Sequence, residues 1–266
     1  MSRRLRLDAE LVRRGLARSR DQAAELIAAG RVEVGGSAAA KAATQVAVDA
    51  AITVREAEAG PEYVSRGGHK LAGALAAFTG LTVAGRRCLD AGASTGGFTE
   101  VLLAAGAAEV VAVDVGYGQL AWSLRSDTRV TVLDRVNVRA LRPEQVAPPP
   151  ELVTADLSFI SLILVLPALV ACAAPDADFV LMVKPQFEVG KGNVGAGGVV
   201  RDPALRQSAV AGVAQAAAAL GLGAAGVTPS PLPGPSGNVE YFLWLRRGAP
   251  PLDEAALARA IEAGPQ

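Results

Sequence analysis

Two consecutive segments constrain the fold of this chain more than any other part. The first, Arg87 to Thr99, reads RCLDAGASTGGFT: a short apolar run, a glycine-rich turn and then good helix formers. The second, Glu109 to Val115, is an apolar run that contains Asp114. A strand, a glycine loop, a helix and a second strand in this order predict an α/β fold with a Rossmann-like unit.

The spacing within these segments predicts a nucleoside-bearing ligand. Asp114 lies about 20 residues beyond Gly92, where Rossmann-like units place an acid on a ribose diol. Glycines let a ligand approach the backbone closely, and the helix that follows offers free N–H groups. The glycine spacing, Gly92-x3-Gly96-Gly97, matches neither the dinucleotide fingerprint nor a P-loop. A pyrophosphate ligand is therefore disfavoured.

The start of the loop, Asp90-Ala91-Gly92, resembles the S-adenosylmethionine (SAM) site of class I methyltransferases. An acid just before the loop suits a ligand with a positive amino group and a sulfonium better than it suits phosphates. Asn137 follows a third predicted strand, where it can hydrogen-bond an adenine edge. An ordinary strand-to-helix turn of another α/β protein is the alternative. The residues assigned to SAM are Asp90, Gly92, Ser94, Gly96, Gly97, Phe98, Asp114, Gln119 and Asn137.

Composition limits the classes of partner. The 266 residues leave room for one large or two smaller domains, and a hydrophobic content of 51% supports a well-filled core. The 26 basic and 26 acidic residues cancel, so any affinity for nucleic acid must come from local clustering. Aromatic residues make up only 4%, which argues against extensive base-stacking surfaces.

Several kinds of site and location are disfavoured. The only cysteines, Cys88 and Cys172, cannot assemble a metal cluster with the single His69. The apolar run Leu157 to Ala174 contains Pro167 and falls short of the ~20 residues of a spanning helix. No apolar signal region follows the N-terminal arginines. We therefore expect no metal, no stable membrane association, a cytoplasmic location and a monomer.

The N-terminal 58 residues are predicted to form a separate α+β module. Helical spacing predicts one helix from Arg6 to Val12 and another from Arg20 to Ala29, each closed by a glycine. Short strands are predicted at Arg31 to Val34 and Ala51 to Val54. A polar linker from Arg55 to Glu62 then leads into a catalytic domain, which we assign to residues 59–266.

This module has a lopsided charge. Eight arginines lie between Ser2 and Arg31 against four acids. Arginine binds phosphate and stacks on bases, so the module is a candidate for RNA binding, although a solvated surface is the alternative. The segment RLDAELVRRGLARSRDQAAELIAAGRVEV resembles an S4 domain, a small RNA-binding fold. The resemblance implies an RNA-binding face with Arg6, Arg18, Arg20 and Lys41.

Four charged residues of the catalytic domain are predicted to converge. Asp156 and Lys184 each end a predicted strand, and Glu240 lies near the start of a late strand. Lys70 is predicted at a helix start, where a lysine is poorly matched to the helix dipole. Charges at the ends of apolar strands are costly unless they are paired or face a cleft. Two structural alternatives remain. The four charged residues could form a salt-bridge network, and Lys70 could be an ordinary surface lysine near a helix end.

The order Lys, Asp, Lys, Glu on this fold resembles the tetrad of ribose 2′-O-methyltransferases of the FtsJ/RrmJ group. A ribose hydroxyl is a very weak acid, and burial beside another cation lowers the pKa of a lysine, which can then take its proton. The hypothesis assigns this step to Lys184, assistance to Lys70, the holding of the amine to Asp156 and completion of the network to Glu240.

Nearly the whole chain is similar to the TlyA family. Besides the S4 segment and the glycine loop, the similarity includes SRGGHK at 65–70, ADLSFIS at 155–161, VKPQFE at 183–188 and GPSGNVE at 234–240. The family implies SAM-dependent 2′-O-methylation of cytidine in 16S rRNA, 23S rRNA or both, with ribosomal RNA or a ribosomal subunit as partner. The alternatives are an RNA-binding ribosome-assembly factor and a haemolysin or membrane-lytic protein.

Overall fold

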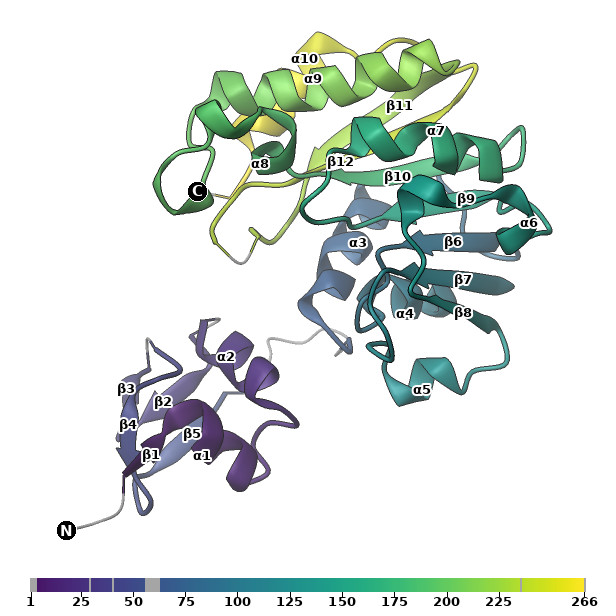
Figure 1. Cartoon of the computed structure of the whole chain (residues 1–266). Coiled ribbons are helices and arrows are strands. Elements are labelled where there is room, and N and C mark those ends of the chain that lie inside the picture. The colour runs from purple at the N-terminus through teal and green to yellow at the C-terminus, as the bar shows by residue number, and fades with distance from the viewer. Residues whose placement is uncertain (1–3, 29, 40, 56–62, 235, 266) are drawn as a thin grey trace. The chain divides into compact units, whose positions relative to one another are not determined.

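The chain forms two compact units, Met1–Glu62 and Tyr63–Gln266 (Figure 1). The computed structural model describes residues 4–28, 30–39, 41–55, 63–234 and 236–265. The boundary that the sequence predicts between residues 58 and 59 lies outside the described residues, as does the linker from 56 to 62.

The described residues of the small unit form two helices and two small sheets. A two-stranded antiparallel sheet pairs β1 with β4, and a three-stranded sheet has the order β3-β2-β5. Leu7 and Leu11 are one helical turn apart, so both face the core, where Ile27 and Val32 also lie buried. The elements are β1 (Arg4–Arg6), α1 (Leu7–Arg13), α2 (Arg20–Ala28), β2 (Val32–Val34), β3 (Ser37–Ala38), β4 (Gln45–Ala47) and β5 (Ile52–Val54).

The start of this unit differs from the sequence prediction. Arg6 does not open a helix: it ends β1 with extended backbone, and α1 begins at Leu7. Leu5 of β1 pairs with Val46 of β4, a contact between segments about 40 residues apart. Strands of three residues carry too little alternating pattern to be recognised locally.

A seven-stranded sheet with the order β11-β12-β10-β9-β6-β7-β8 forms the middle of the large unit. The strands from β8 to β10 in this order run parallel, which confirms the predicted Rossmann-like α/β fold. β12 runs antiparallel to both of its neighbours, β10 and β11. The strands are β6 (Arg87–Ala91), β7 (Glu109–Asp114), β8 (Val130–Asp134), β9 (Leu152–Ala155), β10 (Asp178–Val183), β11 (Leu222–Pro229) and β12 (Tyr241–Arg247).

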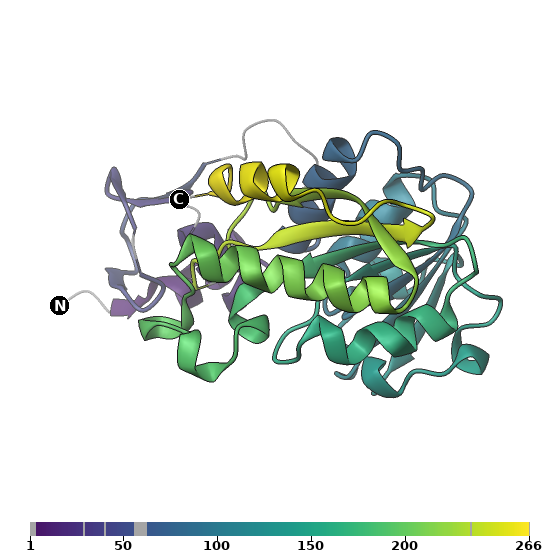
Figure 2. The same ribbon diagram turned by 90° about the horizontal axis from the view of Figure 1, so that it is seen from above.

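Helices cover both faces of this sheet, and each face has its own apolar core (Figure 2). One core includes residues of α3 (Arg66–Ala77), α4 (Gly97–Ala104) and α5 (Trp122–Arg125). The other includes residues of α6 (Pro143–Val146), α7 (Leu162–Cys172), α9 (Pro203–Ala219) and α10 (Glu254–Glu262). Alternate strand residues therefore face opposite cores, and the loops at the strand ends are left to form a site.

The remaining helical pieces are short. They are α8 (Pro185–Glu188) and three 3-10 turns at Val138–Ala140, Lys191–Asn193 and Ala196–Gly198. Across the described part of the chain, no helix has the length and apolarity needed to cross a membrane. The apolar run that begins at Leu157 instead becomes α7, which buries Leu162, Val165 and Leu169 against the sheet.

Candidate functional site

Three of the four predicted catalytic residues follow directly from the strand register. Lys184 and Glu240 lie one position beyond Val183 and Tyr241, the outermost pair that joins β10 to β12. Asp156 is the first residue after β9, which runs parallel to β10. The sheet therefore brings these three side chains to the same edge, where the parallel strands end.

The pair formed by Lys184 and Asp156 is partly open to solvent. Lys184 Nζ lies 2.6 Å from Asp156 Oδ1, and their side chains are 10% and 23% exposed. The same amine donates a hydrogen bond to Ser158 Oγ at 2.9 Å. Sequence reasoning did not select Ser158, although it lies in the ADLSFIS segment two residues beyond Asp156. The two contacts fix the direction of the amine and leave one of its three N–H positions for a further partner.

The pair formed by Lys70 and Glu240 is closed. Lys70 Nζ donates to Glu240 Oε2, and the two side chains are 5% and 1% exposed. The prediction that Lys70 lies at a helix start is wrong: α3 begins at Arg66, so Lys70 is in its second turn. A Cβ atom at Gly234 would lie 2.7 Å from Glu240 Oε1, so the turn before β12 needs a glycine there.

The two pairs are brought together by α3. Gly67 lies one turn before Lys70, and a Cβ atom at Gly67 would be 3.9 Å from Asp156 Oδ2. Residues three apart share a helix face, so the face of α3 with Lys70 is turned toward the second pair. The chain has only four lysines among its 26 basic residues, and two of them are buried in this cluster. Among the described residues no group of acids, histidine and cysteines could hold a metal ion.

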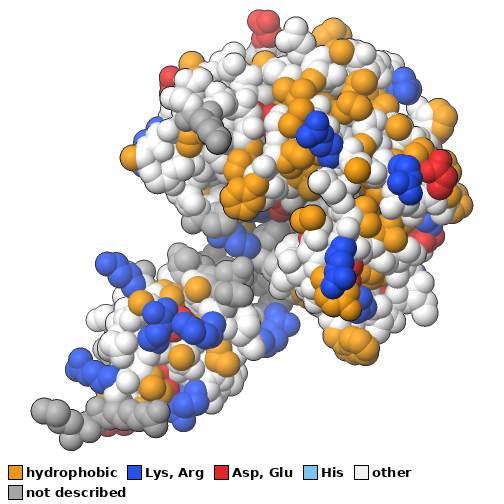
Figure 3. All heavy atoms as spheres, viewed as in Figure 1, with side chains coloured by type: hydrophobic (Ala, Val, Ile, Leu, Met, Phe, Trp, Pro, Cys, Tyr) orange, Lys and Arg blue, Asp and Glu red, His pale blue; other side chains and the backbone are white. Residues whose placement is uncertain are grey.

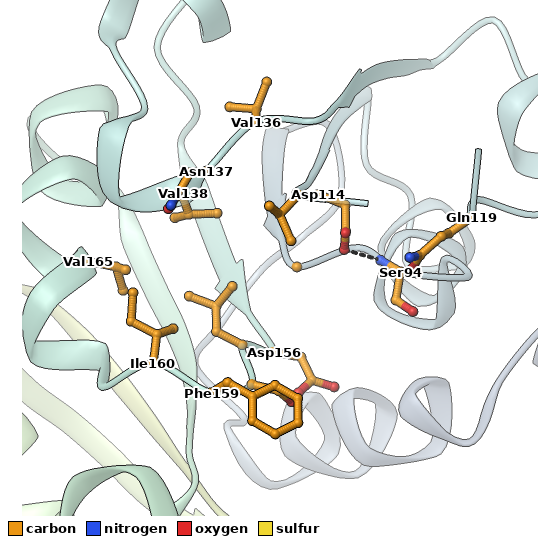
Figure 4. A pocket seen from close by; sticks show the side chains of 14 residues that line it. Ser94, Asp114, Gln119, Val136, Asn137, Val138, Asp156, Phe159, Ile160 and Val165 are labelled. Atoms are coloured by element: carbon orange, nitrogen blue, oxygen red, sulfur yellow. Dashed lines mark hydrogen bonds between the residues drawn. The ribbon is translucent and has the colours of Figure 1, made fainter. Parts of the chain in front are cut away.

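A cavity of about 530 Å³ adjoins this cluster and meets it at Asp156 (Figure 4). Its walls come from the loops that follow β6, β7, β8 and β9. One end is polar and the other is apolar, as a ligand with a charged part and a flat ring requires. The lining residues are Gly92, Ser94, Asp114, Val115, Gln119, Val136, Asn137, Val138, Asp156, Leu157, Ser158, Phe159, Ile160 and Val165.

Backbone hydrogen bonds fix the predicted ribose-binding acid. Asp114 Oδ2 accepts from the Ser94 N–H at 2.8 Å, and its Oδ1 accepts from the Gly116 N–H at 2.7 Å. Gly92 has φ +88°, and a Cβ atom there would lie 2.5 Å from the carbonyl oxygen of Asp156. A glycine is therefore required where the loop passes the end of β9.

Asp90 is a buried acid without a cation. Its Oδ2 accepts a hydrogen bond from Thr99 Oγ1 at 2.7 Å, while its Oδ1 is buried without a hydrogen-bond partner. Burial, which disfavours the charged carboxylate, raises the pKa of Asp90 to about 7. Asp90 does not line the cavity, but its unpartnered oxygen lies at the end of β6, just before the glycine loop, and its chemistry suits a positive group such as the amino group of SAM.

The other residues predicted to contact SAM are divided between cavity and core. Gln119 and Asn137 line the cavity, and Asn137 Oδ1 accepts from the Arg139 N–H at 3.0 Å. Four predicted residues do not line it: Asp90, described above, and three others. Gly96 packs against Leu120 and Leu124, Gly97 against Ser65 and Gly68, and the Phe98 ring is buried 6.0 Å from that of Phe242. These residues shape the loop from behind, because their side-chain positions face the core.

In the small unit, buried acids hold the predicted RNA-binding arginines. Asp8 accepts hydrogen bonds from both Arg6 and Arg20, each 2.9 Å from its Oδ2 at the nearest nitrogen. The Arg6 guanidinium, followed by Arg20, holds the pKa of Asp8 well below its usual range. Arg18 and Lys41 are exposed. Figure 3 shows Lys and Arg side chains at several places on the visible face of this unit.

A second buried acid repeats this arrangement. Glu10 accepts from Arg13 at 2.6 Å and from Arg14 at 2.7 Å, and these bonds lower its pKa to about 2. Sequence reasoning counted Asp8 and Glu10 only as charges that offset arginines. The RLD segment at residues 6–8 carried no signal that Asp8 also binds Arg20, because that contact joins two helices.

Comparison with known proteins covers both units. Residues 63–247 match the family model of FtsJ-like methyltransferases, and residues 5–52 match that of the S4 domain. The chain is 64% identical over 262 residues to a 16S/23S rRNA (cytidine-2′-O)-methyltransferase, TlyA, of Mycobacterium tuberculosis, covering 98% of this chain and 96% of that protein.

Solved structures agree with these matches. A protein from Streptococcus thermophilus described as a hemolysin superposes with a TM-score of 0.78 at 35% identity, covering 98% of this chain and 96% of the other. A SAM-dependent methyltransferase from Listeria monocytogenes superposes with a TM-score of 0.50 at 14% identity, covering 67% and 99%. The second likeness concerns the fold alone.

Proposed function

The chain belongs to the TlyA family, in which an S4 domain precedes an FtsJ-like methyltransferase domain. From this premise we infer that it is an enzyme that methylates the ribose 2′-oxygen of cytidine in ribosomal RNA with SAM as methyl donor. The observation that carries the inference is the pairing of Lys184 with Asp156 at the mouth of the nucleoside-sized cavity. Asp156 and Ser158, the two partners of the Lys184 amine, both line this cavity, which supports a role of the amine beyond a structural ion pair.

The chemical problem is the weak acidity of the ribose hydroxyl. When bound, SAM supplies a methyl group on a sulfonium. The 2′-oxygen would accept this methyl group as the carbon–sulfur bond breaks, with the electron pair of that bond left on sulfur. The hydroxyl proton would pass to Nζ of Lys184, and Asp156 would stabilise the resulting ammonium. In-line placement of oxygen and methyl group supplies much of the rate.

The other residues of the tetrad act on this amine or fix its surroundings. Ser158 and Asp156 direct Lys184 toward the hydroxyl. The buried Lys70 adds a positive charge nearby, and Glu240 compensates that charge, because an unpaired ammonium would be costly at such depth. Lys70 in this role tunes the site without contact to the substrate.

The residues present would also hold SAM. Asp90 Oδ1 would accept from its amino group, Asp114 would bind the ribose diol and Asn137 the adenine edge. The apolar wall with Val136, Val138 and Ile160 would cover the faces of the base. Gln119 and Ser94 lie beside Asp114 and would contact the polar part.

RNA binding is assigned to the small unit together with the rim of the cavity. Arg6, Arg18, Arg20 and Lys41 would bind phosphates in a manner that weakens as salt increases. We propose that the enzyme acts as a monomer in the cytoplasm on 16S rRNA, 23S rRNA or both, within ribosomal subunits.

The test uses labelled SAM with unmodified small and large ribosomal subunits. Label should appear at cytidines where the RNA backbone resists alkaline cleavage, since a 2′-O-methyl group blocks the internal nucleophile. Lys184→Ala should lower the rate on the order of 10²–10⁴-fold while SAM still binds. Label on a base would overturn the role of the tetrad. Absence of label on both subunits would favour an assembly factor, and lysis of erythrocytes without label would favour a haemolysin.

A further inference from the structure

The segment that follows Lys184 is hydrogen-bonded to the start of α7. Glu188, four residues beyond Lys184, accepts a hydrogen bond from the Leu162 N–H at 2.8 Å through Oε1. Its Oε2 accepts from Ser161 Oγ at 2.5 Å, and the same Ser161 oxygen accepts from the Ile163 N–H at 3.2 Å. Glu188 therefore caps a helix that lies 26 residues earlier in the chain. We call this set, Ser161, the Leu162 N–H and Glu188, the clasp.

The clasp is the last of three contacts between the same two segments. Lys184 Nζ bonds to Asp156 and Ser158, and the rings of Phe187 and Phe159 then lie 5.4 Å apart. The segments after β9 and β10 thus touch at each end and in the middle. Phe159 has φ +65° and is 92% exposed, whereas its neighbours Leu157 and Ile160 pack against the core.

The lysine segment cannot hold its own shape. α8 spans only Pro185–Glu188, and a single turn of helix is unstable without outside contacts. Two backbone bonds close this turn, from the Phe187 N–H to the Lys184 carbonyl at 2.9 Å and from the Val189 N–H to the Pro185 carbonyl at 3.0 Å. Neither bond reaches the β9 side. The Glu188 carboxylate does, and it lies at the positive end of the 11-residue helix α7.

Burial disfavours the charged form of the Glu188 carboxylate, and its hydrogen-bond donors offset only part of this effect. Burial raises the pKa of Glu188, while the bonds from Ser161 and Leu162 act in the opposite direction. Lys184, four residues before Glu188, is paired with Asp156. The function of this partly buried acid is therefore to join two segments, not to balance the lysine.

We propose that Glu188 is a positioning residue that sets where the amine of Lys184 stands relative to Asp156 and Ser158. The inference rests on the proposed role of Lys184. Loss of the clasp removes the bond from α8 to the start of α7. α8 keeps its packing against α9, but the amine can then move with respect to the 2′-oxygen. A mutation far from the reacting atoms that misplaces a catalytic group by about 1 Å can lower the rate about 10²-fold. Binding of SAM should not change, because neither Glu188 nor Ser161 lines the cavity.

The experiment measures single-turnover and steady-state methyl transfer with the full chain. Glu188→Ala should lower kcat on the order of 10- to 100-fold with the KM for SAM unchanged. Glu188→Gln keeps one acceptor and gains an amide donor for Ser161 Oγ, so it should restore most of the rate. Glu254→Ala, at an exposed acid of α10, is the matched control and should behave as wild type.

A double-mutant cycle separates positioning from general weakening of the fold. Ser161→Ala should lower kcat less than Glu188→Ala, and adding it to Glu188→Ala should cost almost nothing more, because the two act through one contact. If Glu188→Ala does not fold, Ser161→Ala alone should still reduce kcat without a change in SAM affinity.

Three results would overturn the proposal. They are a wild-type kcat in Glu188→Ala, a Glu188→Gln variant as slow as Glu188→Ala, or additive effects of Ser161→Ala and Glu188→Ala. The proposed function fails by a different result, full activity of Lys184→Ala, so the two ideas can be told apart.

Discussion

Both units of the chain hold cations against buried acids, but they do so at different depths. In the small unit, Asp8 has a side chain only 6% exposed, while its partners Arg6 and Arg20 remain 45% and 59% exposed. In the large unit, Lys70 and Glu240 are both closed off. The first arrangement presents guanidinium groups to solvent in fixed directions. The second holds an amine where water is excluded.

The residue types agree with this difference in depth. Arginine remains charged and binds phosphate oxygens through a planar fork, so it suits a surface that meets a polyanion. Lysine has a compact amine that can lose its proton when it is enclosed. Of the four lysines among the chain's 26 basic residues, two are buried and paired with Glu240 and Asp156. Depth and residue type together indicate binding in one unit and chemistry in the other.

The largest effect is expected where the enclosed pair is broken. Lys70→Ala leaves Glu240 buried without its cation, which should cost about 3–5 kcal/mol in the free energy of unfolding. Urea unfolding of the full chain measures this. The double variant Lys70→Met with Glu240→Gln should recover much of the stability without recovering activity. Equal stability of Lys70→Ala and wild type would show that the pair is not enclosed.

Asp90 extends the comparison, because it is an enclosed acid with no cation of its own. Its pKa of about 7 lies above the usual value of an unfolded aspartate, so the folded state binds the proton more tightly. The stability that this proton contributes is full below about pH 4 and is lost as the pH rises through about 7.

Asp90→Asn should remove this loss of stability. The difference in the free energy of unfolding between variant and wild type should change by a few kcal/mol from pH 4 to pH 8, in favour of the variant at high pH. Unfolding curves at several pH values measure it. Parallel pH dependences for the two proteins would contradict the assignment. The variant should also bind SAM more weakly, because the amino group loses its acid.

In the small unit, removal of an acid should weaken RNA binding. Asp8→Asn adds a positive charge, which by charge alone would raise affinity. If Asp8 pre-orients Arg6 and Arg20, the variant must order both side chains when it binds RNA, at about 0.5–1.5 kcal/mol for each. The Kd of the variant should then be higher by roughly tenfold. Filter binding to rRNA fragments measures it, with Asp127→Asn, whose acid pairs with the exposed Arg129, as control. Unchanged or tighter binding would contradict pre-orientation.

The smallest effect is expected at two exposed cations for which the described residues show no acidic partner. Arg18 lies on the surface, where Gln22 is its side-chain partner among the described residues, and Lys41 is exposed. Arg18→Ala and Lys41→Ala should each reduce the slope of log Kd against log salt by about 0.7–0.9 and leave the rate at saturating RNA unchanged. A salt dependence equal to that of wild type would remove these residues from the interface.

The sequence predicted the sheet well because its strands are apolar runs that end in charged residues. Asp114, Asp156 and Lys184 each follow such a run, so parallel topology alone assigns them to one edge. Sequence reasoning failed where the deciding contact is distant. Gly67 and Gly68 favoured a loop before Lys70, yet α3 includes both, and a Cβ atom at Gly68 would lie 2.4 Å from the Tyr63 ring.

The same limit applies to the residues that sequence reasoning overlooked. Glu188 and Ser161 belong to separate motifs, and their contact spans 27 positions of the chain. Asp8 and Arg20 are 12 positions apart on different helices. Local patterns report on burial and on helix and strand period, but they do not show which polar side chains meet across elements.

The most direct test of the difference between the two units exchanges lysine and arginine in each. Single-turnover methyl transfer is measured at saturating RNA and SAM for Lys184→Arg and for Arg20→Lys. Both exchanges keep the charge. Arginine cannot take a proton, so Lys184→Arg should be slower on the order of 10²–10⁴-fold, whereas Arg20→Lys should retain the wild-type rate. A Lys184→Arg enzyme that transfers methyl groups at the wild-type rate would contradict the role assigned to the Lys184 amine.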